Sequence, residues 1–477
     1  MMRNYFLLFL AVIFLSNQAC ADVKKTSCLN EETDSFGIFG TIHIYRKTDT
    51  PKQVVLFISG DGGWNLGVVD MARSLAELDG MVVGIDITHY IKQLNASQEQ
   101  CSYGAADFEA LSQYLQKKYH YDHYVQPIIV GYSSGATMVY AVLAQAPVNT
   151  FAGGISLGFC PDLETAKPFC KGNGSLSSVV DKKLGFVYQT VDSLVSPWVV
   201  LQGDQDQVCS TPDTKIFLSK IENAELSELP KVGHGFSVPR NWMPEFKEAY
   251  AHIVEKNTVA VLPESKEGTK DLPLVELPAP GKSDTLAIFV SGDGGWASLD
   301  KKIAEALNKN NISVVGLNSL QYFWDKKTPE TSATDLARIM ETYQQSWGTK
   351  HFIIAGYSQG ADVIPFMISG LPESLRKQIQ SVSLLGLESE VDFEFHVSNW
   401  VSSDDSGHYQ VIPEVKKLQG MNITCIYGDE EKNSACNKLE RPETHIIEMK
   451  GGHHFGGNYQ RLAEIILDFE NKEATQP

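Results

Sequence analysis

The sequence has no surplus of basic residues and, after its first residues, no long hydrophobic run. Lys and Arg total 40 against 58 Asp and Glu, and the net charge is −18. An acidic chain repels phosphate backbones, so nucleic acid is not an expected partner. A membrane span needs about 20 consecutive apolar residues, so no span is expected in the body of the chain. The 43% hydrophobic and 21% charged residues are typical of a globular protein, and 477 residues suffice for two or three domains.

The apolar run at the N-terminus has the features of a targeting segment. Arg3 supplies a positive charge before the run from Tyr5 to Leu15, which is too short to span a membrane. Ala19-Cys20-Ala21 fits a cleavage site, so residues 1–21 are predicted to be a signal peptide for export. The competing interpretation is a lipoprotein acylated at Cys20. Asn17 argues against it, because a lipobox has a Leu-like residue at that place.

Cysteine is scarce, but export permits disulfides. Cleavage of the signal peptide would remove Cys20 from the eight cysteines and leave an odd number, so at least one should be free or paired elsewhere. The predicted bridges join the pairs closest in sequence, Cys160 with Cys170 and Cys425 with Cys436. No pair has the C-x₂-C spacing of a zinc site, so neither a metal nor another cofactor is expected.

The chain contains two long copies of one pattern. The hexapeptide SGDGGW occurs at Ser59–Trp64 and again, unchanged, at Ser291–Trp296. Matched segments follow in the same order in both copies: Val82-Val83-Gly84 with Val314-Val315-Gly316, Gly131-Tyr132-Ser133 with Gly356-Tyr357-Ser358, Gly203-Asp204 with Gly428-Asp429, and Gly233-His234 with Gly452-His453. Two long copies indicate a duplicated domain and not a solenoid. We predict a first domain over residues 22–255, a Pro-containing linker over 256–284 in which Leu274–Leu277 resembles an edge strand, and a second domain over 285–477.

Each copy alternates short apolar strands with helical patterns. In the first, apolar runs at Val54–Ser59, Met81–Asp86 and Ile128–Val130 predict strands, while Phe108, Leu111 and Leu115 share one helix face. Continuous apolar strands separated by helices are typical of a mostly parallel sheet with helices on both faces. The predicted fold class is therefore α/β, present twice.

Both copies place a serine in the sequence G-x-S-x-G, at Gly131–Gly135 and Gly356–Gly360. Each motif follows an apolar strand and opens a helix, as the nucleophile elbow of an α/β-hydrolase fold requires. In that fold an acid and then a histidine follow the serine along the chain. The candidate catalytic residues are Ser133, Asp206 and His234 in the first copy and Ser358, Glu431 and His453 in the second, with Asp204 and Asp429 as alternative acids.

An oxyanion hole would need two backbone N–H donors in each copy. One donor should come from the residue after the serine and the other from the SGDGGW loop, which gives Ser134, Asp61 and Gly62 in the first copy and Gln359, Asp293 and Gly294 in the second. Because a carboxylate repels an oxyanion, Asp61 and Asp293 are interpreted as bonding their own loop, with a cationic group of the substrate as the alternative partner. His454 lies next to His453, but no third ligand stands at a useful spacing for metal.

The second copy carries further motifs: LPLVELPA from Leu272 to Ala279, Tyr322-Phe323-Trp324 followed by Thr328-Pro329-Glu330, GYSQGADVIPF from Gly356, and GGHHF from Gly451. Together with SGDGGW they resemble the bacterial VirJ virulence-protein family, and the two-copy layout is similar to its longer, AcvB-type members. The resemblance implies a periplasmic α/β-hydrolase fold associated with type IV secretion and, for the AcvB type, hydrolysis of lysyl-phosphatidylglycerol. It also implies that Ser358 is the nucleophile and His453 the base.

The expected function is an exported serine hydrolase that cleaves an aminoacyl ester of a phospholipid or a small ester. The second copy is predicted to perform most of the turnover, because it carries the full set of motifs. Pro365 interrupts the helix after Ser358, where the first copy has Tyr140, so an active first copy is the rival. The alternative function is a periplasmic adaptor that binds secretion-system proteins and retains its triads without needing them.

The segments Cys160–Val191 and Glu388–Pro413 lie where this fold usually inserts elements that cover the substrate. The second insert carries aromatic residues that either contact lipid or pack a small cap: Phe393, Phe395, Trp400 and Tyr409.

Overall fold

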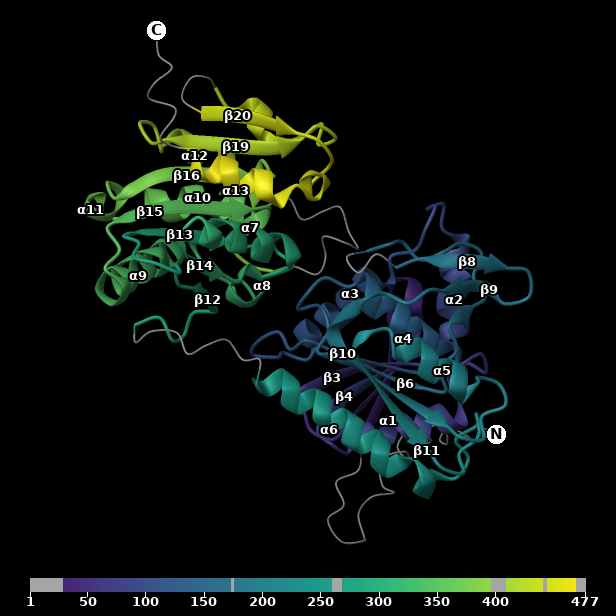
Figure 1. Cartoon of the computed structure of the whole chain (residues 1–477). Coiled ribbons are helices and arrows are strands. Elements are labelled where there is room, and N and C mark those ends of the chain that lie inside the picture. Colours follow the sequence, from purple (N-terminus) through teal and green to yellow (C-terminus); the bar gives the residue numbers. More distant parts are fainter. Residues whose placement is uncertain (1–28, 173–175, 260–267, 396–408, 441–443, 469–477) are drawn as a thin grey trace, which may run out of the picture.

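The computed structural model describes residues 29–172, 176–259, 268–395, 409–440 and 444–468. The expected signal peptide, Cys28 and Trp400 lie outside these residues. Two α/β domains follow one another along the chain, each with its own sheet (Figure 1). The predicted fold class is therefore confirmed: an α/β-hydrolase fold that occurs twice.

The first sheet is parallel except at one edge. Its strands lie in the order β1 (Asn30–Phe36), β2 (Gly40–Arg46), β4 (Gly80–Ile85), β3 (Gln53–Ile58), β5 (Ile128–Tyr132), β6 (Gly153–Leu157), β10 (Ser193–Gly203) and β11 (Glu222–Leu229). The pairs β1–β2 and β2–β4 are antiparallel, and the remaining pairs are parallel. The apolar runs around Val54, Met81 and Ile128 form β3, β4 and β5 in the interior of this sheet, where both of their faces are covered.

Helices cover both faces of the first sheet. The helices α1 (Leu66–Ala76) and α6 (Met243–Val259) pack on one face, while the opposite face is covered by α2 (Ile87–Ala96), α3 (Gly104–Lys118), α4 (Ser134–Gln145) and α5 (Thr211–Leu218). Phe108, Leu111 and Leu115 of α3 are fully buried, as their spacing predicts. Each sheet face therefore has a separate apolar layer.

The second sheet repeats this order, and the described residues form no counterpart of β1 in it. Its strands lie in the order β12 (Leu274–Leu277), β14 (Ser313–Leu317), β13 (Thr285–Val290), β15 (His351–Tyr357), β16 (Ile379–Leu385), β19 (Ile423–Gly428) and β20 (Thr444–Met449). The expected edge strand forms as β12, which pairs antiparallel with β14.

Helices also cover both faces of the second sheet. The helices α7 (Ser298–Lys309) and α13 (Tyr459–Leu467) cover one face, and the other is covered by α8 (Ser319–Tyr322), α9 (Pro329–Trp347), α10 (Gln359–Ser369), α11 (Glu373–Arg376) and α12 (Val411–Lys416). Among the helices of the described residues, none combines the length and the apolar character needed to cross a bilayer.

Short strands form inserts between the strand after the elbow helix and the acid strand. In the first domain β7 (Asp162–Leu163), β9 (Gly185–Tyr188) and β8 (Ser178–Asp181) make a small sheet. In the second, β17 (Glu390–Val391) pairs with β18 (Tyr409–Gln410). Phe393 is 2% exposed and its ring packs against Phe323 and Phe366. This residue therefore packs the insert against the domain and is not available to contact lipid.

The predicted Cys160–Cys170 bridge is wrong. Cys160 is bonded to Cys209 and Cys170 to Cys101, while the predicted Cys425–Cys436 bridge is confirmed. The error has a topological cause: Cys160 follows β6 and Cys209 follows β10, and these strands are neighbours in the sheet although far apart in the chain. In the described part of the chain no cysteine is free.

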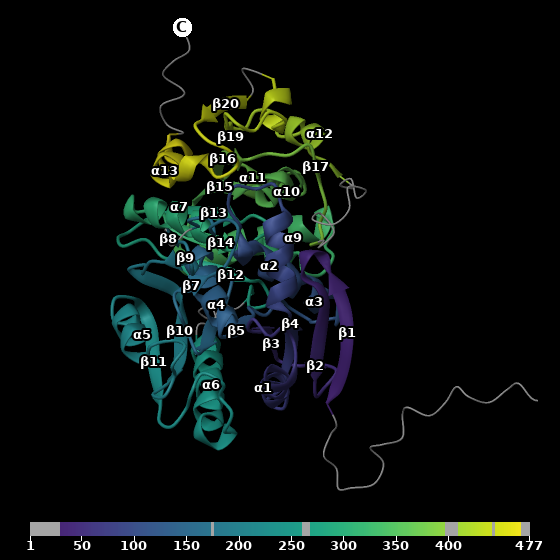
Figure 2. The ribbon, with the colours of Figure 1, turned by 90° about the vertical axis from the view of Figure 1, so that its right-hand side faces the viewer.

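The two domains meet through α3 of the first and the loops around α8 of the second (Figure 1). The second domain, green to yellow, lies above the first in both ribbon views (Figures 1 and 2). The indole of Trp324 donates to the Tyr121 carbonyl at 2.7 Å, and the Lys117 ammonium group donates to the Trp324 carbonyl. Asn149 donates to the carbonyl of Trp296, the last residue of the second SGDGGW loop, at 2.7 Å. A small apolar cluster completes the contact: Tyr124, Leu320, Trp324 and Phe395.

Candidate active sites

Each candidate nucleophile occupies a strained turn between a strand and a helix. Ser133, between β5 and α4, has φ 56° and ψ −122°, and Ser358, between β15 and α10, has φ 53° and ψ −126°. Non-glycine residues rarely adopt this backbone region, and such strain is concentrated at functional sites. A Cβ on Gly135 would lie 2.4 Å from the Ser59 carbonyl oxygen, and one on Gly360 would lie 2.1 Å from the Val290 carbonyl oxygen. The motif glycines therefore allow the elbow helix to start against the neighbouring strand.

The first copy brings its three predicted residues into one hydrogen-bonded chain. Ser133 Oγ lies 2.9 Å from His234 Nε2, and His234 Nδ1 lies 2.8 Å from Asp206 Oδ2. The Asp206 carboxylate is fully buried. Its Oδ1 accepts the backbone N–H groups of Val208 and Cys209, both at 2.9 Å. The acid is therefore held in place by its own loop, which the Cys160–Cys209 disulfide ties to the end of β6.

The second copy assembles the histidine–acid pair but leaves the serine separate. His453 Nδ1 lies 2.6 Å from Glu431 Oε1, and the Glu431 Oε2 atom accepts the N–H of Gly428 at 2.6 Å. Ser358 and His453, both described, share no hydrogen bond. The side chain of His453 is 35% exposed against 17% for His234, so the second pair is the more open of the two.

The alternative acids bond their own loops and not the histidines. The carboxylate of Asp204 accepts the N–H of Lys231 at 2.7 Å. The carboxylate of Asp429 accepts the N–H of Gly451 at 2.9 Å and pairs with the Lys450 ammonium group at 2.6 Å. Asp206 and Glu431 are therefore the carboxylates that contact the histidines.

Among the residues that the structure describes, one group at these sites is close enough to hold a metal ion, and one of its members is not free. Asp206, Cys209 and His234 lie close enough to share an ion, but the Cys209 sulfur is bonded to Cys160 and cannot act as a thiolate ligand. His454, the neighbour of His453, lies with Nδ1 3.1 Å from the Tyr357 hydroxyl. Burial and the neighbouring His453 lower the pKa of His454, which favours its neutral form.

The candidate oxyanion donors at the helix starts and in the SGDGGW loops differ in whether their N–H groups already have an acceptor. Ser134 and Gln359 are the first residues of α4 and α10, so their N–H groups have no acceptor within the helix. In the second SGDGGW loop the N–H of Gly294 donates to the Asp293 carboxylate at 3.0 Å. Asp293 thus bonds its own loop, as interpreted from the sequence. The corresponding donors of the first loop belong to Asp61 and Gly62.

Sequence reasoning missed a glycine that makes room for each histidine. Gly158 has φ +67° and Gly386 has φ +68°, and each follows the strand next to the elbow strand. A Cβ on Gly386 would lie 2.6 Å from His453 Cε1, and one on Gly158 would lie 3.2 Å from His234 Cε1. The signal was present as a further matched pair, Leu157-Gly158 with Leu385-Gly386.

Buried carboxyl groups surround the second site. Asp362, four residues after Ser358, is 4% exposed, and its carboxylate accepts the N–H of Glu388 at 2.7 Å. Burial raises the pKa of Asp362 well above its usual range and also raises the pKa of Glu388. A raised pKa favours the neutral form of a carboxyl group, so these two groups do not by themselves indicate the charge of the substrate.

The strand order, the two serine elbows and the two histidine–carboxylate pairs define an α/β-hydrolase-type protein. More closely, the chain belongs to the bacterial virulence protein (VirJ) family, whose family model matches residues 52–152 and 284–474. The second match contains Ser358, Glu431 and His453, whereas the first contains Ser133 and ends before Asp206 and His234. The curated proteins include no match to the chain.

Several solved structures are similar to part of the chain. A dienelactone hydrolase from Anabaena variabilis has 14% identity and a TM-score of 0.34, and the match covers 48% of this chain and 98% of that one. Est1E from Butyrivibrio proteoclasticus has 14% identity and a TM-score of 0.31, over 48% and 99% of the two chains. An α/β serine hydrolase homologue from Coxiella burnetii has 18% identity and a TM-score of 0.30, over 47% and 96%.

Proposed function

We propose that this chain is an exported serine hydrolase that cleaves an aminoacyl ester of a phospholipid, with lysyl-phosphatidylglycerol as the substrate. The observation that carries the hydrolase proposal is the connected chain Ser133–His234–Asp206, repeated in the second copy as the His453–Glu431 pair behind Ser358. A serine at an elbow with a histidine held by a carboxylate is the arrangement used for acyl transfer.

The chemistry follows from the positions of these groups. The serine oxygen bonds to the lysyl carbonyl carbon while the histidine Nε2 takes the hydroxyl proton. The tetrahedral oxyanion accepts hydrogen bonds from the elbow N–H and the SGDGGW loop. The C–O bond to the glycerol breaks as the histidine returns the proton to the leaving alcohol. Water then attacks the lysyl-enzyme ester by the same route and releases lysine and the free serine.

We assign most of the turnover to the second copy. Its residues fall entirely within the match to the VirJ family, whereas the acid and the histidine of the first copy lie outside it. In apo structures catalytic hydrogen bonds are often long and tighten when substrate binds, so the open Ser358–His453 pair is compatible with this role. The rival is the first copy, whose serine already bonds its histidine.

Export to the periplasm is part of the proposal. The disulfides Cys101–Cys170, Cys160–Cys209 and Cys425–Cys436 support it, because such bonds persist in oxidising compartments.

The test is hydrolysis by the purified chain of lysyl-phosphatidylglycerol in phosphatidylglycerol vesicles, with released lysine as the readout. A fluorophosphonate probe run in parallel reports whether either serine is activated. Labelling together with lysine release supports the proposal. Labelling without lysine release supports a serine hydrolase but contradicts lysyl-phosphatidylglycerol as its substrate. A folded sample that neither releases lysine nor labels favours the adaptor, which would bind secretion-system proteins.

A further inference from the structure

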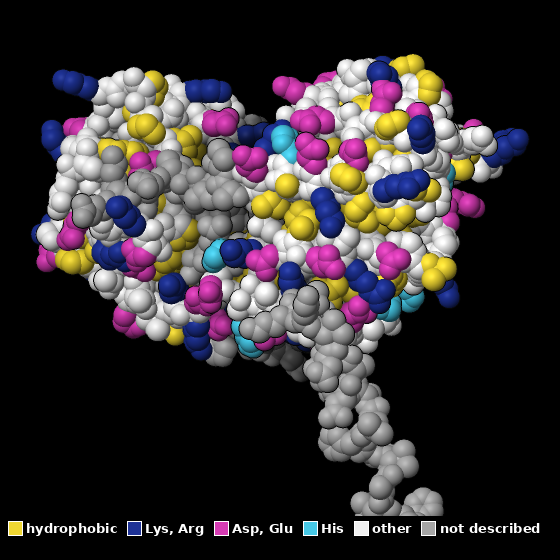
Figure 3. Space-filling model, turned by 90° about the horizontal axis from the view of Figure 1, so that it is seen from below, with side chains coloured by type: hydrophobic (Ala, Val, Ile, Leu, Met, Phe, Trp, Pro, Cys, Tyr) yellow, Lys and Arg dark blue, Asp and Glu magenta, His cyan; other side chains and the backbone are white. Residues whose placement is uncertain are grey.

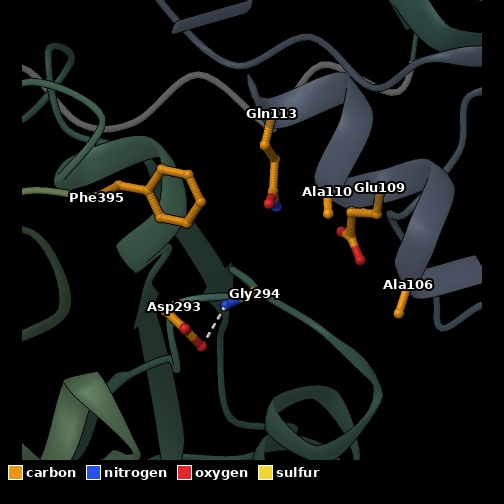
Figure 4. A pocket seen from close by; sticks show the side chains of 7 residues that line it. All are labelled: Ala106, Glu109, Ala110, Gln113, Asp293, Gly294 and Phe395. Carbon is orange, nitrogen blue, oxygen red and sulfur yellow. Dashed lines mark hydrogen bonds between the residues drawn. The ribbon is translucent and has the colours of Figure 1, made fainter. Parts of the chain in front are cut away.

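A cavity of about 80 Å³ lies between the two domains, next to the second SGDGGW loop (Figure 4). One face of α3 in the first domain supplies Ala106, Glu109, Ala110 and Gln113, and the second domain supplies Asp293, Gly294 and Phe395. The α3 residues recur at the spacing of a single helix face, so this helix presents one stripe to the other domain.

The loop that lines the cavity also passes close to the candidate nucleophile of the second copy. A Cβ on Gly292 would lie 3.4 Å from Ser358 Cβ, and the next two residues, Asp293 and Gly294, line the cavity. The N–H of Gly294, a candidate oxyanion donor in the sequence, donates to the Asp293 carboxylate. The SGDGGW loop therefore connects the surroundings of Ser358 with the cavity.

Gln113 is the first sign that the cavity takes a ligand. Its side chain is 7% exposed, and its amide points into the cavity (Figure 4). Within the described ranges the amide has no hydrogen-bond partner. A polar side chain in a largely buried residue is usually paired, so this amide is available to a polar group in the cavity.

The charges of the cavity determine what that partner can be. Glu109 points into it from α3 and Asp293 lies on the opposite wall (Figure 4). Among the described residues that line it there is no Lys, Arg or His. The nearby Lys117 is directed to the carbonyl and ring of Trp324. Two carboxyl groups and an amide oxygen are acceptors suited to an ammonium group, and the small volume favours the slender end of a lysyl side chain.

We propose that this inter-domain cavity binds the side-chain ammonium group of the substrate, with Glu109 and Gln113 of the first domain as specificity-determining residues for hydrolysis at Ser358. The inference rests on the proposed function for its lysyl substrate. It gives the duplicated domain a role: the first domain completes the substrate site of the second. Both domains are thus needed for selectivity, even where one serine performs the chemistry.

The direct test is binding of Nα-acetyl-lysinamide to the full chain by calorimetry, against Nα-acetylnorleucinamide, which has the same four side-chain carbons and a hydrogen atom in place of the ammonium group. We expect acetyl-lysinamide to bind the wild type, and Glu109→Gln to weaken that binding at least tenfold. Glu341→Gln, which removes an exposed carboxylate on α9, is the matched control and should leave binding unchanged. Gln113→Leu should weaken it severalfold without removing a charge.

The proton carried by Glu109 supplies a second readout. Burial and the charge of Asp293 raise the pKa of Glu109 to about 8. The other titratable groups that interact with it, Tyr103 and Tyr124, have raised pKa values and stay neutral at this pH. Affinity for acetyl-lysinamide should therefore increase from pH 6.5 to 8.5 in the wild type, since the ligand stays charged to about pH 10. It should be independent of pH in Glu109→Gln.

The outcomes separate the two proposals. Equal binding of the two amides, or equal loss in Glu109→Gln and Glu341→Gln, overturns the cavity assignment whether or not lysyl lipid is cleaved. The chain could instead bind acetyl-lysinamide selectively through Glu109 and release no lysine from lysyl lipid. That result would support the cavity as an ammonium site and contradict the proposed reaction. Circular dichroism of each variant confirms that it is folded before either conclusion is drawn.

Discussion

At the scale of single residues, the two serines have nearly the same backbone and different surroundings. Both sit at positive φ after a strand, but Ser133 bonds a histidine that is 17% exposed and Ser358 faces one that is 35% exposed. The elbow thus fixes the position of the serine oxygen in both copies. The copies differ in whether the serine is hydrogen-bonded to the histidine in the absence of substrate.

The serines give the sharpest prediction at this scale. Ser358→Ala should remove most hydrolysis of lysyl-phosphatidylglycerol, and Ser133→Ala should leave most of it. Loss of a nucleophilic oxygen typically costs several orders of magnitude in kcat, so initial rates of lysine release separate the two. If Ser133→Ala is the variant that abolishes release, the turnover belongs to the first copy and our assignment is wrong.

Asp300 gives a prediction on stability. It is 1% exposed in α7, and burial raises the pKa of its carboxyl group to about 7. The unfolded value is about 4, so the folded state holds the proton more tightly and loses this advantage as the pH rises through about 7. The wild type should therefore lose on the order of 3 kcal/mol relative to Asp300→Asn between pH 4.5 and pH 8.

Urea unfolding of both proteins at the two pH values measures this difference. Asn retains an oxygen for the Ala297 N–H, which now donates to Asp300 Oδ2 at 2.9 Å. Asp192→Asn, at an exposed position, is the control and should show no such dependence on pH. Parallel curves for the wild type and Asp300→Asn would contradict the prediction.

At the scale of elements, each SGDGGW loop interlocks with the neighbouring strand. A Cβ on Gly84 of β4 would lie 2.0 Å from the Trp64 ring, and one on Gly316 of β14 would lie 2.2 Å from the Trp296 ring. The repeated Val-Val-Gly and Gly-Gly-Trp segments are thus two sides of one contact. The tryptophan fixes the loop that carries the candidate oxyanion donors, and the glycine on the strand makes room for it.

This contact predicts a coupled pair. Gly316→Ala should destabilise the second domain by about 1–3 kcal/mol, the usual cost of overpacking a core. In a Trp296→Leu background the same substitution should cost less, because the smaller side chain leaves space for the methyl group. Urea unfolding of the four proteins of this cycle gives the coupling energy. Additive effects would mean that the ring and the glycine do not constrain each other.

At the scale of the whole molecule, the chain forms two lobes with Lys, Arg, Asp and Glu side chains interspersed over the face shown in Figure 3. The lobes are joined through Trp324, which is 2% exposed and contacts both Lys117 and Tyr121 of the first domain. A buried tryptophan at such a contact is typically worth several kcal/mol, so this residue should account for much of the docking.

Trp324→Ala should therefore uncouple the domains. We expect differential scanning calorimetry to resolve separate transitions in the variant, and we expect small-angle scattering to give a larger radius of gyration than for the wild type. Trp347→Ala, in the same domain at the end of α9, is the control. It should lower the stability of the second domain without changing the coupling. Unchanged dimensions in Trp324→Ala would show that other contacts hold the lobes together.

The sequence by itself determined the duplication, the order of strands and helices, the elbows and the identity of each histidine. These features depend on local patterns, because apolar runs and the G-x-S-x-G motif with its glycines each lie within a short stretch of the chain. The choice of Asp206 and Glu431 over Asp204 and Asp429 also followed from position within a loop, and the structure places those two carboxylates against the histidines.

Only the tertiary structure decided which distant groups meet. The partners of Cys160 and Cys170 depend on which strands are neighbours in the sheet, and separation along the chain carries no such information. The opening between Ser358 and His453 and the meeting of Glu109 with Asp293 depend likewise on how loops and domains pack. Motifs such as the elbow can be recognised because their residues are neighbours in the chain. A site shared by two domains forms only after both domains have folded and docked.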